Sequence, residues 1–82
     1  MASSTEKSDQ ERDEITRAFG ANLRRFRKKA GLTQGELAEQ AGLHVNYISG
    51  ADRGERNLSL VNIVKLARAL GVSASDLLEG VE

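Results

Sequence analysis

Six positively charged side chains lie close together in the sequence, and they are the first candidates for a binding site. They fall within residues 17–29, a stretch that contains no Asp or Glu. The six are Arg17, Arg24, Arg25, Arg27, Lys28 and Lys29. Guanidinium and ammonium groups at this density attract phosphate, so the stretch favours a nucleic-acid contact. The same pattern also fits an ordinary solvated helix face.

The net charge of zero hides an uneven distribution of charge along the chain. Residues 15–70 hold ten basic and four acidic residues, a net charge of +6. Residues 1–14 and residues 71–82 each carry a net charge of −3. The sequence therefore predicts a basic domain with acidic ends, which keeps nucleic acid among the candidate partners.

Composition excludes several classes of site. The chain has no Cys and a single His, which excludes a disulfide scaffold, a thiolate zinc site and cysteine chemistry. The acidic residues are scattered over faces expected to be exposed, and no Gly-rich phosphate loop precedes a helix, so we expect neither an enzyme nor a cofactor. The N-terminus is polar, and no apolar run approaches the ~20 residues that cross a bilayer. We expect a cytoplasmic protein.

The elements that must position these residues are helices. The 82 residues include no Pro and no strand-like alternation, so the chain is expected to be a single all-α domain. We expect five helices: residues 11–29, 33–40, 44–52, a fourth capped by Ser59 and ended by Gly71, and a short fifth after Ser73. Residues 1–10 are expected to form a flexible polar tail and residues 11–82 the folded domain.

Local signals mark the helix ends. Thr33 and Glu36 have the spacing of a capping box, and Ser73 and Asp76 repeat it. Gly31, Gly42 and Gly71 are placed to end helices in the left-handed conformation. Apolar residues at helical spacing predict the buried stripes of the first and fourth helices. These are Ile15, Phe19, Leu23, Phe26 and Ala30, and then Leu60, Ile63, Ala67 and Leu70.

Motifs at fixed spacing then give a specific resemblance. The stretch LRRFRKKAGLTQGELAEQAGLHVNYISG, from Leu23 to Gly50, resembles the Cro/C1-type helix-turn-helix family, also called the Xre family. The resemblance continues through ADRGERNLSL and ALGVSASDLL and spans about residues 15–80. Within that family, the small size and the segment RNLSLVNI are similar to the controller proteins of restriction–modification systems. The resemblance implies a compact five-helix bundle of the lambda-repressor type that regulates transcription by binding double-stranded DNA.

In that family the third helix enters the major groove and the second crosses the DNA backbone. The resemblance therefore implies base readout by Val45, Asn46 and Ser49. Asn46 can present its amide to adenine, and Val45 can contact a thymine methyl group. A core contact against the second helix is the alternative for Val45.

The resemblance also implies phosphate contacts from the second helix, the third helix and the loop that follows it. The residues are Gln34, His44, Tyr47, Arg53, Arg56 and Asn57. Each has a plainer alternative: Gln34 as a helix-start residue, His44 as a solvated cap, Tyr47 as a cover over the seam between the third and fourth helices. The loop residues could simply be solvated.

A structural ion pair is implied between Arg27 and Asp52, which stands where the family has Glu. Arg27 is then not expected to contact DNA. Ala51 replaces the usual Ile, which either underfills the core or is compensated by a neighbour.

One short recognition helix reads few base pairs, so we expect a homodimer on a pseudo-palindromic operator with half-sites about 34 Å apart. By family analogy, Leu77, Leu78 and Val81 are the candidates for the dimer interface, and some of them are expected to be core residues instead. No second domain is seen that would hold a small-molecule effector. The alternative hypothesis is a protein-interaction module, such as an antitoxin or adaptor, that uses the same helical surface.

Overall fold

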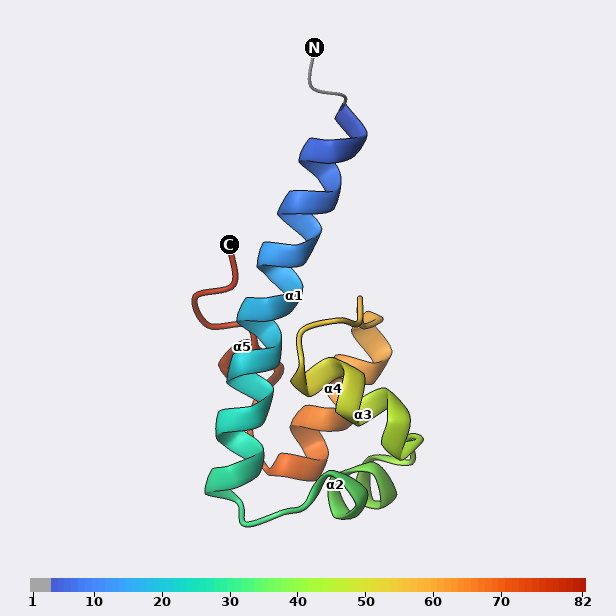
Figure 1. Cartoon of the computed structure of the whole chain (residues 1–82). Helices are drawn as coiled ribbons and strands as arrows, with labels where there is room; N and C mark the ends of the chain where they lie inside the picture. The colour runs from blue at the N-terminus through green and yellow to red at the C-terminus, as the bar shows by residue number, and fades with distance from the viewer. Residues whose placement is uncertain (1–3) are drawn as a thin grey trace.

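The computed structural model describes residues 4–82, and over that range it consists of five α-helices and their connections, without a β-strand (Figure 1). The helices are α1 Ser4–Lys29, α2 Gln34–Ala41, α3 Val45–Asp52, α4 Leu60–Leu70 and α5 Ala74–Leu77. The expected all-α, five-helix fold is confirmed. Within the described range, no helix combines the length and the apolar character needed to cross a membrane.

The predicted helix ends are confirmed by their hydrogen bonds. At the start of α2 the Glu36 N–H donates to Thr33 Oγ1 (3.0 Å), and the Thr33 N–H donates to Glu36 Oε1 (2.9 Å). Ser73 and Asp76 form the same capping box at α5. The glycines after α2 and α4 have φ angles of 70°, the left-handed conformation in which residues other than glycine are strained.

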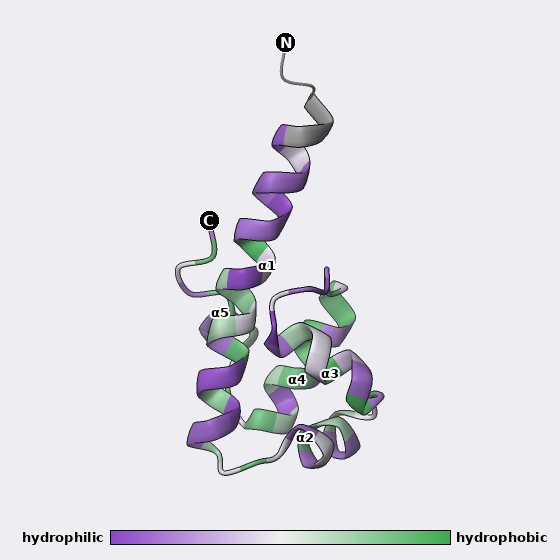
Figure 2. Cartoon of the chain, viewed as in Figure 1, coloured by the Kyte–Doolittle hydropathy of each residue, from purple (hydrophilic) through white to green (hydrophobic). Residues whose placement is uncertain are grey.

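The start of α1 differs from the prediction. The helix begins at Ser4 rather than near Glu11, because the polar segment before Glu11 contains neither Gly nor Pro and places acidic residues at the positive end of the helix dipole. Figure 1 shows these first turns projecting beyond the other helices, and Figure 2 shows that the part of the projection formed by residues 7–14 is hydrophilic. The flexibility expected of residues 1–10 stays a prediction, and residues 1–3 lie outside the described range.

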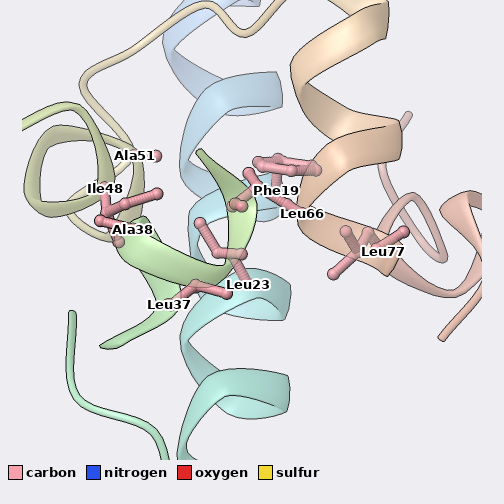
Figure 3. Packing of buried hydrophobic residues seen from close by; sticks show 10 residues of the cluster. Phe19, Leu23, Leu37, Ala38, Ile48, Ala51, Leu66 and Leu77 are labelled. Carbon is pink, nitrogen blue, oxygen red and sulfur yellow. The ribbon is translucent and has the colours of Figure 1, made fainter. Parts of the chain in front are cut away.

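The core is formed by residues of all five helices (Figure 3). Its buried members are Phe19, Leu23, Leu37, Ala38, Ala41, Ile48, Ala51, Leu66, Ala67 and Leu77. Three expectations need correction. At the two ends of the stripe on α1, Ile15 is 43% exposed and Ala30 is exposed as well. Leu77 has no exposed surface, so it fills the core of one copy and is not available as a dimer contact. On α4 the buried stripe centres on Leu66 and Ala67, which leaves Leu60 72% exposed.

Glycine lets α1 cross directly over the end of α3. A Cβ atom at Gly20 would lie 2.6 Å from the Ala51 carbonyl oxygen, and a Cβ at Gly54 would lie 2.7 Å from the Arg17 Cα. Both distances are too short for any side chain, so the two backbones are in contact here. Ala51, whose carbonyl lies at this crossing, is fully buried.

Candidate nucleic-acid interface

The tight turn between α2 and α3 fixes the relative position of the two helices. After α2 the Leu43 N–H donates to the Ala38 carbonyl (2.9 Å), and α3 starts at Val45. Leu37 and Ala38 of α2 and Ile48 of α3 are buried in the same core. The opposite face of each helix is therefore left to solvent, which is the arrangement of a helix-turn-helix.

The first turn of α3 presents its side chains outward. Val45 is 42% exposed and Asn46 is also exposed, so Val45 is not the core contact considered as its alternative. His44 caps the helix, with its Nδ1 accepting a hydrogen bond from the Asn46 N–H (3.0 Å). An accepting Nδ1 is unprotonated, so the neutral ring carries its proton on Nε2. That N–H is free to donate to a group outside the helix.

Ser49 and Arg53 are brought together one turn further along α3. Arg53 Nη1 donates to Ser49 Oγ (2.6 Å), and Arg53 Nε donates to Glu55 Oε2 (3.1 Å). All three residues are at least partly exposed. The hydroxyl of Ser49 thus has a cation directly beside it on the surface.

Tyr47 covers the seam between α3 and α4. It is half-buried, and its hydroxyl oxygen accepts a hydrogen bond from Asn62 Nδ2 (3.0 Å). Arg56, from the loop after α3, places its guanidinium carbon 5.6 Å from the centre of the Tyr47 ring. Asn57 follows in the same loop and is exposed. Two cations, Arg53 and Arg56, therefore lie against α3, whereas Asn57 borders the groove formed with Ile15 and Leu58.

The Arg27–Asp52 ion pair is present, and it includes Gln34. Asp52 Oδ2 accepts hydrogen bonds from Arg27 Nε (3.0 Å) and Nη2 (2.8 Å) and from Gln34 Nε2 (3.1 Å). The side chains of Arg27 and Asp52 are only 12% and 3% exposed, so Arg27 points into the fold rather than toward a ligand. One donor of the Gln34 amide is used inside the protein, and this bond joins the start of α2 to the end of α3.

Electrostatics on the helical surface come from charged side chains that remain exposed. Four exposed cations lie on the outer face of α1: Arg24, Arg25, Lys28 and Lys29.

Hydrogen bonds with Thr33 lower the pKa of the Glu36 carboxyl below its ordinary value of 4.5, and the bond from the Thr33 backbone N–H has the largest effect. Among the described residues, no three His, Asp or Glu side chains come together to hold a metal ion.

Sequence reasoning missed two features. Asn22 is buried in α1, and its Nδ2 donates to the carbonyls of Leu77 (2.9 Å) and Glu79 (2.8 Å), which anchors the C-terminal segment. At the start of α4, Leu60 and Val61 are 72% and 62% exposed. The helix has eight apolar residues in eleven, more than one buried stripe needs, and that excess was the available signal.

The other two residues expected at a dimer interface border a groove. Leu78 is 39% exposed and Val81 is half-buried. They line an apolar groove of about 110 Å³ between α1, the loop before α4 and the C-terminal segment, together with Ile15, Leu58 and Ile63. The part of the chain that the structure describes therefore has an apolar surface at this groove and a separate one at the start of α4.

Comparison with known proteins gives consistent results. Residues 23–77 match the family described as Helix-turn-helix. The chain is 47% identical over 62 residues to control protein C.BamHI of Bacillus amyloliquefaciens, covering 74% of this chain and 76% of that protein. It is 38% identical over 71 residues to control protein C.MunI of a Mycoplasma species, and the match covers 85% of this chain and 96% of that protein. The crystal structure of the restriction-modification controller protein C.AhdI from Aeromonas hydrophila superposes with a TM-score of 0.74 at 47% identity, covering 76% of this chain and 94% of that one.

Proposed function

Because this chain belongs to the helix-turn-helix family and is a DNA-binding transcriptional regulator rather than an enzyme, we propose that it reads a specific operator with α3. The exposed first turn of α3 carries this proposal. Val45 and Asn46 are both free of the core there, and a helix N-terminus in the major groove brings its first residues to the base edges. Asn46 then reads adenine and Val45 contacts a thymine methyl group.

The surrounding side chains are proposed to hold the backbone of the same DNA. His44 donates from Nε2, and Arg53, Arg56 and Asn57 contact phosphates from the end of α3 and its loop. Gln34 keeps one amide N–H and its oxygen for this purpose while the other N–H is bound to Asp52. Ser49 reaches the groove beside Arg53, to which it is hydrogen-bonded. Tyr47 can still donate its hydroxyl hydrogen, since Asn62 uses only the oxygen.

The regulator is proposed to act as a homodimer whose interface includes the start of α4. Among the residues whose exposure the structure describes, Leu60 and Val61 are the two most exposed of the large apolar ones, and Val64 lies beside them. Asn62 in the same turn is bonded to Tyr47 of α3. A two-fold contact through this turn would relate the two α3 helices by the symmetry that an operator with two half-sites requires.

A matched pair of variants tests which apolar surface is used. Val61→Glu should convert the dimer to a monomer in analytical ultracentrifugation, because a charged side chain in the apolar contact would have to lose its water. Leu78→Glu, at the groove, should leave the dimer intact. If instead Leu78→Glu dissociates the dimer and Val61→Glu does not, the groove is the interface.

Selection of bound duplexes from a random DNA pool tests operator reading itself. We expect an enriched inverted repeat, with half-sites about one helical turn apart. Affinity for that repeat should fall steeply with added salt, because phosphate contacts release counterions. A folded protein that enriches no motif at low salt would contradict the proposal.

The biological role is proposed to be that of a controller of a restriction–modification system. This chain matches the relatives named as control proteins, and the solved controller protein, over most of their own length. The enriched motif should then occur upstream of the gene for this chain and beside restriction or modification genes. A motif found only at unrelated promoters would contradict this role.

A further inference from the structure

Arg56 is held against α3 rather than extending freely from its loop. A Cβ atom built on Gly50, in the middle of α3, would lie 2.9 Å from Arg56 Cγ and 3.0 Å from Arg56 Nε. The arginine side chain therefore occupies the space that any other residue at position 50 would fill. The guanidinium group continues to the Tyr47 ring, 5.6 Å from its centre.

The positions of these residues on the helix give the direction of the arginine. Tyr47 and Gly50 are three residues apart, so they are neighbours on one row of the helix surface. Arg56 follows that row, with its Cγ and Nε against Gly50 and its guanidinium group near the ring of Tyr47, which lies in the first turn of α3. Tyr47 is itself fixed by the hydrogen bond from Asn62 of α4.

We infer that Gly50 and Tyr47 are positioning residues that hold the Arg56 guanidinium beside the N-terminal part of the recognition helix. This inference rests on the proposed DNA-binding role of Arg56. An exposed arginine loses side-chain freedom when it binds a phosphate, and an arginine that is already held loses less. Glycine inside a helix is otherwise unfavourable, and Gly50 has an ordinary helical φ angle, so backbone conformation does not require it.

The inference predicts opposite effects on stability and on DNA binding for Gly50→Ala. Alanine favours the helix over glycine, and the exposed Arg56 side chain can swing away, so the melting temperature should stay equal or rise. Affinity for the selected operator should fall about tenfold, which corresponds to about 1.4 kcal/mol. The loss should be similar for unrelated duplexes, and the salt dependence should weaken by about one phosphate contact.

A double-mutant cycle separates loss of arginine positioning from a direct clash of the new methyl group with DNA. In an Arg56→Ala background, Gly50→Ala should have almost no further effect on affinity. In an Arg53→Ala background it should keep its full effect, since Arg53 is bound to Ser49 and Glu55 instead. A tenfold loss that persists without Arg56 would overturn the inference, as would unchanged affinity in Gly50→Ala alone.

A measurement on the free protein keeps this result distinct from failure of the proposed function. In the NMR spectrum of the wild type, the Tyr47 ring should shift the Arg56 side-chain signals upfield. Gly50→Ala and Tyr47→Leu should both remove that shift. If the wild type shows the shift and both variants lose it, but no duplex is bound, the proposed function fails while the positioning is confirmed. Arg56 signals at ordinary positions in the wild type would overturn the positioning itself.

Discussion

Removing the Asp52 carboxylate should destabilise the fold far more than removing a surface acid. In Asp52→Ala, Arg27 loses two hydrogen bonds and its counter-charge while its side chain remains 12% exposed. Breaking one side of a buried ion pair costs about 3–5 kcal/mol. Arg27 keeps its hydrogen bond to the Leu32 carbonyl (2.9 Å), so we expect the lower end, about 3 kcal/mol.

The chain contains a matched exposed pair for comparison. Arg53 and Glu55 are separated by 3.1 Å, but their side chains are 57% and 61% exposed. Glu55→Ala should therefore cost less than about 1 kcal/mol. For a domain of this size, 1 kcal/mol corresponds to about 4–8 °C in melting temperature, so Asp52→Ala should melt about 12–24 °C below the wild type.

Thermal unfolding followed by far-ultraviolet circular dichroism measures both variants, at one protein concentration because dimerisation would make the melting temperature concentration-dependent. Replacing both partners with apolar residues, Arg27→Met with Asp52→Leu, should recover most of the lost stability, because no buried charge is left unpaired. The reasoning is refuted if Asp52→Ala melts no lower than Glu55→Ala, or if the apolar double variant is no more stable than Asp52→Ala.

Three further predictions concern base readout, the C-terminal anchor and acid sensitivity. Asn46→Ala should relax base preference at one operator position and cost about 1–3 kcal/mol of binding; an unchanged preference after a second duplex selection would remove Asn46 from readout. Asn22→Ala deletes one buried and one partly buried hydrogen bond, so we expect a loss of about 2 kcal/mol in thermal unfolding and earlier cleavage after α5 by carboxypeptidase. Cleavage at the wild-type rate would show that the anchor is dispensable. Folding lowers the pKa of Glu36. The ionised carboxylate therefore stabilises the folded protein at any pH above the pKa that Glu36 has in the unfolded chain, and this stabilisation is lost as the pH falls through the lower pKa of the folded state. The difference in melting temperature between wild type and Glu36→Gln should accordingly shrink from pH 6 toward pH 3, and a difference independent of pH would contradict the capping role.

Features governed by local sequence could be predicted, and those governed by distant partners could not. The capping box of Thr33 and Glu36 needs only residues three apart, and the helix end at Gly42 needs only a left-handed φ angle. Asn22 gives no such signal, because the carbonyls that it binds lie 55 and 57 residues further along the chain.

Apolar residues were the harder case, because burial in one copy and burial between copies select the same residue types. Leu77 was a candidate for the contact between copies and lies in the core, whereas Leu60 was expected in the core and is exposed. Which face of α4 turns inward is decided by how Leu66 and Ala67 meet the other helices, and periodicity alone does not contain that information. The Arg27–Asp52 pair was found only through the family resemblance.

The projecting first turns of α1 give this neutral chain an electrical orientation. Acidic residues predominate before Ile15, and basic residues predominate in the rest of α1, near α2 and α3 (Figure 1). Opposite charges at the two ends of a molecule 46 Å long make a large dipole moment. In the field of a polyanion such a molecule experiences a torque, even when the net force on it is small. We therefore expect it to approach DNA with the basic half of α1 leading, and added salt should slow association by weakening this torque.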